Sequence, residues 1–291
     1  MLRLPAPAKL NLYLRVLGRR PDGYHELETL FERIDLADEL TFEPHPSELA
    51  LACSEMSLPC DETNLVLKAA RALREATDTH RGARIHLTKR IPIGAGLGGG
   101  SSDAATTLVG LNRFWNLGLL RERLIELGAQ LGSDVPFFLG ASPFAIGRGR
   151  GERCEELAGP LPTLWHVLVV PPERLSTKAV YEGVGNLTGS PSSINIVAHA
   201  LRNGSLGELA SGLVNDLAPE AIRRCPIIEE IHVRLLAGGC LAAAVTGSGS
   251  AVYGLVRDAR HADEAAQHVR AHGDPRWSVS VVHTQHESLV A

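Results

Sequence analysis

A run of glycines in the first half of the chain has the composition of a site that binds phosphate groups. Five glycines fall within residues 94–100, and a helical pattern begins near Ser101. Glycine lets consecutive backbone N–H groups point to one side without a side-chain clash, and a helix N-terminus adds the positive end of its dipole. The run therefore predicts a cradle for a polyphosphate.

Two familiar loop chemistries fit this run poorly. A P-loop ends in Gly-Lys-Ser/Thr, whose lysine reaches the β- and γ-phosphates, whereas here Ser-Ser follows the last glycine. Gly94, Gly96 and Gly99 match a dinucleotide fingerprint, but that fingerprint also needs a second parallel strand that ends in Asp or Glu about 20 residues later. Helical patterns follow instead. A flexible turn between a strand and a helix stays an alternative.

The run resembles the phosphate loop of the GHMP kinases, which act on galactose, homoserine, mevalonate and phosphomevalonate. Their motif is Pro-x-x-x-Gly-Leu-Gly-Ser-Ser-Ala-Ala, and this chain adds Gly99-Gly100 and carries Asp103 inside it. The matching residues are Pro92, Gly96, Leu97, Gly98, Ser101, Ser102, Ala104 and Ala105. Together with Pro-Ala-Lys-Leu-Asn-Leu at 7–12 and Leu-Gly-Ser-Asp-Val-Pro-Phe-Phe at 131–138, the loop makes the chain similar to the 4-diphosphocytidyl-2-C-methyl-D-erythritol kinases from residue 5 to about 256.

This resemblance implies an enzyme that uses ATP and Mg²⁺ to phosphorylate the 2-hydroxyl of 4-diphosphocytidyl-2-C-methyl-D-erythritol in the non-mevalonate route to isoprenoid precursors. The residues it assigns to ATP are Pro92, Gly94, Ala95, Gly96, Leu97, Gly98, Gly99, Gly100, Ser101 and Ser102. Another kinase of the superfamily, such as homoserine or mevalonate kinase, is an alternative that dependence on cytidine would exclude. A catalytically silent nucleotide-binding protein is a second alternative, which ATP binding without turnover would support.

Asp134 precedes an apolar run, and because an unpaired carboxylate is costly to bury, it needs a cationic or hydrogen-bonding partner. The resemblance implies that Lys9 is this partner, that Asp134 accepts the proton of the substrate hydroxyl, and that Asn11 hydrogen-bonds the substrate. Alternatively, Asp134 caps the following helical turn. Without the resemblance, Lys9 would be interpreted as an ordinary solvated lysine at the start of a strand.

The resemblance places the cytosine base of the substrate among Tyr24, His25 and Tyr181, with Thr177 in the same segment as Tyr181. Aromatic residues make up only 4% of the chain, so their occurrence at matching positions is informative. The alternative is that these tyrosines are ordinary amphipathic residues between surface and core.

A third glycine-rich motif joins two apolar stretches between 243 and 252 and, by the same resemblance, faces the phosphates of the substrate. Its assigned residues are Thr246, Gly247 and Ser248. An ordinary loop is the alternative. The sequence leaves open whether Arg148 and Arg150 bind phosphate. It also leaves the metal ligands open, with Ser102 and the ATP phosphates as candidates, and suggests 58–68 as a place for adenine.

Several elements must position these residues. Apolar and polar residues alternate over 9–17, which predicts a half-buried strand with Lys9 and Asn11 on one face. Turn residues at 20–23 predict that the chain returns from Tyr24 as an antiparallel partner. The further elements predicted in the first half are strands at 38–43, 48–53 and 83–89, a helix that begins near Ser101 and continues through 106–116, and helices at 64–76 and 121–131.

The second half has the order β-α-β-β-α-β with extra helices in the first crossover. Its predicted elements are strands at 164–170, 241–246, 250–256 and 277–283, helices between 176 and 237, and a helix at 258–271. The predicted fold is α+β, a two-domain GHMP kinase fold. As the resemblance implies, residues 1–158 form an ATP-binding domain like ribosomal protein S5 domain 2, and 159–291 form a ferredoxin-like (split βαβ) substrate-binding domain.

Composition limits the class of partner. The chain has 291 residues and a formal net charge of −4, which argues against nucleic acid or a membrane surface as partner. It has neither a signal-peptide core nor about 18 consecutive apolar residues, so we expect a cytoplasmic enzyme with a small-molecule substrate, as a monomer or a weak homodimer. Five cysteines without a C-x-x-C pair predict neither disulfides nor a zinc site.

Overall fold

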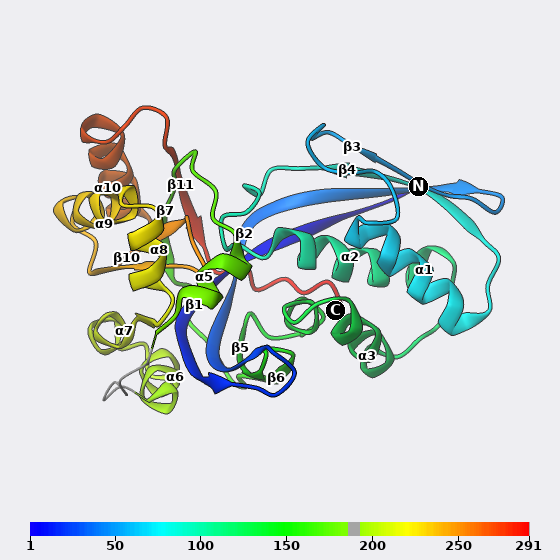
Figure 1. Cartoon of the computed structure of the whole chain (residues 1–291), viewed down its shortest axis with the longest axis horizontal. Coiled ribbons are helices and arrows are strands. Elements are labelled where there is room, and N and C mark those ends of the chain that lie inside the picture. The colour runs from blue at the N-terminus through cyan, green and yellow to red at the C-terminus, as the bar shows by residue number, and fades with distance from the viewer. Residues whose placement is uncertain (186–192, 291) are drawn as a thin grey trace.

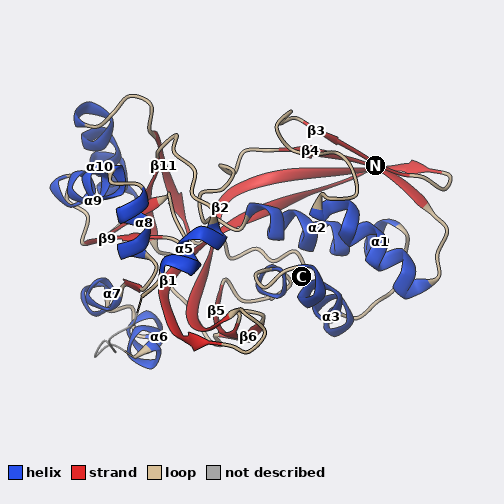
Figure 2. Cartoon of the chain, in the orientation of Figure 1, coloured by secondary structure: helices blue, strands red, loops and turns tan. Residues whose placement is uncertain are grey.

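The computed structural model of the chain describes residues 1–185 and 193–290, which form two units, each a sheet with helices packed on it (Figures 1 and 2). The strands of the first unit are β1 (Leu2–Arg19), β2 (His25–His45), β3 (Leu49–Cys53), β4 (Gly82–Thr88), β5 (Phe144–Gly149), β6 (Arg153–Glu156) and β8 (Val214–Asn215). Its helices are α1 (Leu65–Thr77), α2 (Gly99–Phe114), α3 (Arg121–Leu131) and α4 (Val135–Phe138).

A long antiparallel pair, β1 and β2, forms the spine of the first sheet. The order is β3-β4-β2-β1-β8, and β5 pairs with β2 and with β6. The turn between β1 and β2 has Gly23 at φ +86°, and the N–H of Gly23 donates to the carbonyl of Arg20 at 3.1 Å. The predicted turn and antiparallel return are therefore confirmed, and the strand predicted at 38–43 is part of β2.

The prediction that the first strand is half-buried is wrong, because β1 is buried on both faces from Ala6 to Val16. Lys9 and Asn11 do share one face, but segments from far along the chain cover them. The N–H of Lys9 donates to the carbonyl of Leu97 at 3.0 Å, and the N–H of Asn11 donates to Thr246 Oγ1 at 3.1 Å. Burial of polar side chains here is a consequence of long-range packing, which a local alternation pattern does not report.

The second unit consists of a sheet with strand order β11-β7-β10-β9 and the helices around it. Its strands are β7 (Trp165–Val170), β9 (Ala242–Val245), β10 (Val252–Val256) and β11 (Ser278–His283). Its helices are α5 (Thr177–Gly183), α6 (Ile194–Arg202), α7 (Leu206–Gly212), α8 (Ala218–Arg224), α9 (Ile227–Ala237) and α10 (Ala259–His272). The predicted β-α-β-β-α-β order is confirmed. The short strand β8, which was not predicted, interrupts the helices and pairs in parallel with β1.

The two units share buried contacts. Leu10 and Leu12 of β1 belong to the same core cluster as Tyr253 and Leu255 of β10. After β11 the chain runs back to the first unit, where Leu289 packs into its core (Figure 1). The domain boundary at 158/159 stays a prediction.

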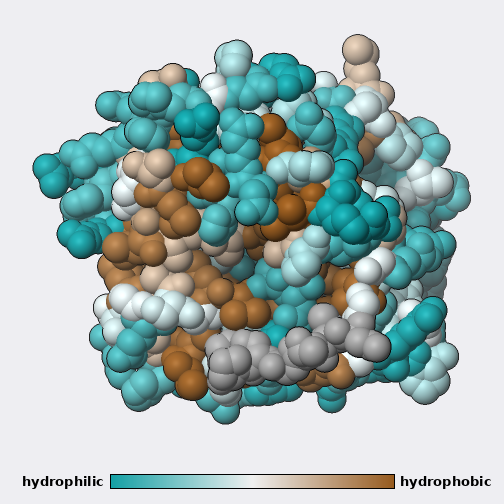
Figure 3. Space-filling model, turned by 60° about the vertical axis from the view of Figure 1, so that its left-hand side comes forward, coloured by the Kyte–Doolittle hydropathy of each residue, from teal (hydrophilic) through white to brown (hydrophobic). Residues whose placement is uncertain are grey.

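The surface is mixed in character. Figure 3 brings the second unit forward and shows hydrophobic residues among hydrophilic ones on that face. Within the described residues, no helix combines the length and apolar character that crossing a bilayer requires.

Candidate active site

A cleft of about 1800 Å³ lies where β1, the glycine loop, α5 and the loop after β9 come together. Most of the predicted site residues line it: Lys9, Asn11, Tyr24, His25, Pro92, Gly94, Ala95, Gly96, Leu97, Gly98, Gly99, Gly100, Ser101, Asp134, Thr177, Tyr181, Gly247 and Ser248. Ser102 and Thr246 are buried behind this lining. Residues from both halves of the chain thus meet in one cleft.

The glycine loop passes closely against two other parts of the site. Gly96 and Gly98 have φ of +82° and +71°, in the left-handed region that favours glycine. A Cβ on Gly96 would lie 2.2 Å from the carbonyl oxygen of Thr246, and one on Gly98 would lie 2.9 Å from Cγ of Lys9. Helix α2 begins at Gly99, near the predicted start, so its first N–H groups lie at the cleft.

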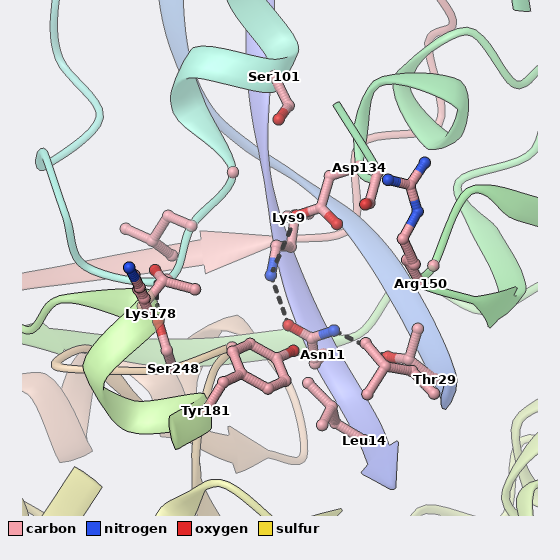
Figure 4. Close-up of a pocket in the computed structure, with 18 of the residues that line it drawn as sticks. Lys9, Asn11, Leu14, Thr29, Ser101, Asp134, Arg150, Lys178, Tyr181 and Ser248 are labelled. Carbon is pink, nitrogen blue, oxygen red and sulfur yellow. Dashed lines mark hydrogen bonds and ion pairs between the residues drawn. The ribbon is translucent and has the colours of Figure 1, made fainter. Parts of the chain in front are cut away.

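Lys9 and Asp134 come together in this cleft, as Figure 4 shows. Lys9 Nζ lies 3.8 Å from Asp134 Oδ2 and donates to Asn11 Oδ1 at 2.5 Å. Lys9 is 4% exposed, and burial lowers its pKa while the charge of Asp134 opposes that shift. Asp134 occupies the residue before α4, but its side chain makes no capping hydrogen bond, so the capping alternative is not supported.

Aromatic and hydroxyl side chains line the part of the cleft between the β1–β2 turn and α5. The rings of His25 and Tyr181 stack with centroids 5.3 Å apart. Thr177 Oγ1 and Ser248 Oγ lie 3.0 Å apart, so α5 contacts the loop after β9. Tyr24 is exposed, and the guanidinium of Arg150 lies 4.9 Å from its ring centroid.

The structure distinguishes the two arginines that the sequence left open. Arg150 lines the cleft. Arg148 forms ion pairs with Glu28 and Glu155, at 3.4 Å and 3.0 Å. Sequence reasoning could not separate them because both lie in the same glycine-rich stretch.

A buried charged cluster behind the glycine loop was not predicted. Lys89 Nζ pairs with a carboxylate oxygen of Asp38 and, at 2.8 Å, with Asp103 Oδ2. Burial raises the pKa of Asp103 to about 7 even though Lys89 opposes the shift. Asp38 Oδ1 also accepts the N–H of Ile91 at 2.8 Å. One feature of the sequence could have indicated this cluster, namely the occurrence of Asp103 inside the glycine motif. The partners of Asp103, however, can be identified only from the fold.

Candidate metal ligands are few. No group of three or more His, Cys, Asp or Glu side chains suited to a metal ion occurs in 1–185 or 193–290. Ser102 Oγ and Asp103 Oδ1 are buried and have no hydrogen-bond partner among the described residues. Oxygen atoms of this kind suit Mg²⁺, which typically takes one or two protein oxygens together with substrate phosphates and water.

Comparisons with known proteins agree over nearly the whole chain. Two family models match, GHMP kinases N terminal domain over residues 64–141 and GHMP kinases C terminal over 197–275. The chain is 42% identical over 287 residues to the 4-diphosphocytidyl-2-C-methyl-D-erythritol kinase of Citrifermentans bemidjiense. This match covers 97% of this chain and 99% of that protein.

Solved structures match as well. A crystal structure of 4-(cytidine 5'-diphospho)-2C-methyl-D-erythritol kinase has a TM-score of 0.82 and 39% identity, and the match covers 98% of this chain and 100% of that one. Homoserine kinase from Cytophaga hutchinsonii has a TM-score of 0.80 over 98% of this chain and 96% of its own, at 18% identity, and is therefore similar in fold alone.

Proposed function

We infer the activity of this chain from the family to which it belongs, the 4-diphosphocytidyl-2-C-methyl-D-erythritol kinases, which are GHMP kinases. The predicted α+β GHMP kinase fold is therefore confirmed. The chain is a phosphotransferase that phosphorylates the 2-hydroxyl of 4-diphosphocytidyl-2-C-methyl-D-erythritol, giving the 2-phosphate and ADP, in the methylerythritol phosphate route to isoprenoid precursors. The observation that carries this conclusion is 42% identity over 97% of the chain.

Phosphoryl transfer requires a phosphate cradle, an aligned hydroxyl and compensation of charge, rather than extensive covalent chemistry by the protein. In our proposal, the N–H groups of the glycine loop and of the first turn of α2 bind the ATP phosphates. Asp134 accepts the proton of the attacking hydroxyl, and Lys9 offsets the negative charge that develops. The distance of 3.8 Å between Lys9 Nζ and Asp134 Oδ2 supports a shared role at one reacting centre.

The acceptor occupies the part of the cleft nearest α5. His25, Tyr24 and Tyr181 enclose the cytosine, and a base stacked on an aromatic ring gains about 1–3 kcal/mol. Thr177, Gly247 and Ser248 face the two phosphates of this substrate, and Asn11 hydrogen-bonds its erythritol portion. In the same proposal, the adenine of ATP lies near Asn64 and Lys89, which also line the cleft.

Mg²⁺, when bound with ATP, neutralises charge on the phosphates. Ser102 Oγ and Asp103 Oδ1, which have no hydrogen-bond partner within 1–185 and 193–290, lie next to the phosphate loop and would hold it. The cytoplasmic location and the monomeric or weakly dimeric state stay predictions.

The test is ADP release by the purified protein with ATP and Mg²⁺. Four alcohols are offered in parallel: the diphosphocytidyl compound, methylerythritol phosphate, mevalonate and homoserine. We expect turnover with the first alone. Turnover with mevalonate or homoserine instead would keep the kinase fold and discard the cytosine site, and nucleotide binding without any turnover would indicate a silent binding protein.

A further inference from the structure

Thr29, on β2, is a buried hydroxyl residue in the lining of the cleft to which no role has so far been given. It is 1% exposed and makes two short hydrogen bonds. Its Oγ1 donates to the carbonyl of Tyr13 at 2.7 Å and accepts from Asn11 Nδ2 at 2.8 Å. Thr29 therefore connects the backbone of β1 to a side chain that contacts Lys9.

The chemistry of these groups gives the contacts a fixed direction. A backbone carbonyl can only accept, so the single hydroxyl proton of Thr29 goes to Tyr13. The lone pairs of Thr29 then face Asn11, which must present its NH₂ group there. The amide oxygen of Asn11 consequently faces Lys9, which can only donate. A flipped amide would place its NH₂ against the amine of Lys9 and its oxygen against the oxygen of Thr29.

The backbone of Asn11 is held independently of Thr29. Its N–H donates to Thr246 Oγ1 at 3.1 Å, and its carbonyl accepts from the hydroxyl of Tyr253 at 3.0 Å. The amide oxygen of Asn11 also accepts from Thr246 Oγ1, at the longer distance of 3.4 Å. Loss of the Thr29 hydroxyl therefore leaves β1 in place but removes the partner of Asn11 Nδ2, so that the orientation of the amide depends on the contacts of its oxygen with Lys9 and Thr246. The consequence falls on Lys9, whose shortest hydrogen bond is to Asn11 Oδ1.

The position of the Lys9 amine depends on that amide. With one N–H of Lys9 directed to Asn11, the others can reach Asp134 and the reacting groups, and the centroid of the Phe31 ring lies 5.8 Å from Nζ. Figure 4 shows the dashed contacts that run from Lys9 to Asn11 and from Asn11 to Thr29. In a buried site a small displacement of a catalytic group is costly, because effective catalysis depends on pre-aligned groups.

We propose that Thr29 is a positioning residue, whose hydroxyl fixes the amide of Asn11 and thereby aims the amine of Lys9 at the site of phosphoryl transfer. This inference rests on the proposed function, because it gives Lys9 a part in the reaction. Thr29 acts through Asn11, so it affects the chemical step and leaves the glycine loop that binds ATP unchanged.

The experiment compares Thr29→Val, which has nearly the same shape without the hydroxyl, with Thr29→Ser, which retains it. Steady-state kinetics is measured with ATP and the diphosphocytidyl substrate, and melting temperatures verify folding. We expect Thr29→Val to lower kcat about 10- to 100-fold with KM for ATP within about twofold of wild type, and Thr29→Ser to recover most of kcat. If Thr29→Val does not fold, Thr29→Ala takes its place in the same comparison.

A double-mutant cycle with Asn11→Ala separates positioning from a general structural effect. If Thr29 acts through Asn11, Thr29→Val should cause little further loss of kcat in the Asn11→Ala background. Additive losses would overturn the proposal, as would equal losses in the Val and Ser variants or an unchanged kcat in Thr29→Val. If the wild-type protein does not phosphorylate the diphosphocytidyl substrate at all, the proposed function itself fails, which the wild-type control reports separately.

Discussion

At the scale of single residues, the proposed catalytic site contains a lysine whose charge is poorly solvated. Lys9 is almost completely buried, which lowers its pKa, and the charge of Asp134 counteracts that effect. Asp134 is more open, with 30% of its side chain exposed, and remains accessible from the cleft. The pair therefore combines a fixed cation with an accessible carboxylate, which suits a base that must meet an incoming hydroxyl.

Substitution of Asp134 by Asn tests this assignment. The amide cannot accept a proton, so we expect kcat to fall by at least about 100-fold with KM for both substrates little changed, as for an interaction made in the transition state. Steady-state kinetics measures the effect. Asp35→Asn is the matched control, because Asp35 pairs with His283, and neither residue lines the cleft. Near-normal kcat in Asp134→Asn would remove Asp134 from the role of base.

At the scale of elements, the glycine loop and the loop after β9 are built against each other. The carbonyl of Thr246 occupies the space that a side chain on Gly96 would need, and the N–H of Ala251 donates to the carbonyl of Ala95 at 3.2 Å. The loop that is proposed to bind ATP therefore contacts the loop that is proposed to face the acceptor. This contact fixes the positions of the two loops, and so of the two proposed binding sites, relative to each other.

Gly96→Ala should disturb that contact. The new Cβ would meet backbone at 2.2 Å, and alanine is strained at φ +82°, so we expect the free energy of unfolding to fall by about 2–4 kcal/mol. Gly100→Ala is the control, because its Cβ would meet only Leu65 Cδ1 at 3.6 Å and alanine favours a helix. Urea denaturation without nucleotide measures both. Equal stability of the two variants would contradict the close approach.

Helix α8 carries a carboxylate whose ionisation is linked to folding. Hydrogen bonds from Arg223 and then Arg224 lower the pKa of Glu220 from an ordinary 4.5 to about 2. A lowered folded-state pKa means that the charged form stabilises the fold above about pH 4.5, and that this contribution is lost as the pH falls toward 2.

The stability of Glu220→Gln relative to wild type should therefore depend on pH. We expect the variant to be less stable at pH 7 and the difference to vanish between about pH 4.5 and 2, as followed by thermal unfolding across that range. Glu264→Gln is the control, because its exposed contact with Arg260 is an ordinary surface pair at 3.6 Å. A difference that is constant with pH would show that the ionised carboxylate is not responsible.

At the scale of the whole molecule, a buried polar link joins the two units. Nε2 of His166, on β7, lies 2.8 Å from Oε2 of Glu32, on β2. Thr284, which follows β11, donates to the other oxygen of Glu32 at 2.6 Å. All three side chains are almost completely buried. The link therefore contributes to holding the two units together, and residues of both units line the cleft.

His166→Phe should lower the free energy of unfolding of the whole protein. It removes one partner of a buried carboxylate, which typically costs about 3 kcal/mol of unfolding free energy. The control is Arg123→Ala, which removes an exposed ion pair with Glu126 and should cost no more than about 1 kcal/mol. Urea denaturation measures both. A loss below about 1 kcal/mol for His166→Phe would mean that the link adds little to the joining of the units.

Much of the architecture could be predicted from the sequence because it follows from local rules. Turn residues at 20–23 place β2 antiparallel to β1, and a period of two places Lys9 and Asn11 on one face. The β-α-β-β-α-β order follows from periodicity and length in the same way. The glycine motif, through its resemblance to known kinases, predicted a phosphate loop, and residues of that loop line the cleft.

The sequence by itself determined most of the longer elements, which segments carry glycine, hydroxyl and charged residues, and to which family the chain belongs, whereas the short strands β5, β6 and β8 were not predicted. Only the tertiary structure decided that β1 is buried on both faces, that Arg150 and not Arg148 lines the cleft, and that Thr29 contacts Asn11. The same holds for the pairing of Lys89 with Asp38 and Asp103. The physical reason is range: torsional preference and periodicity act between near neighbours in the chain, whereas burial, ion pairing and hydrogen-bond direction depend on segments that meet only when both sheets have packed.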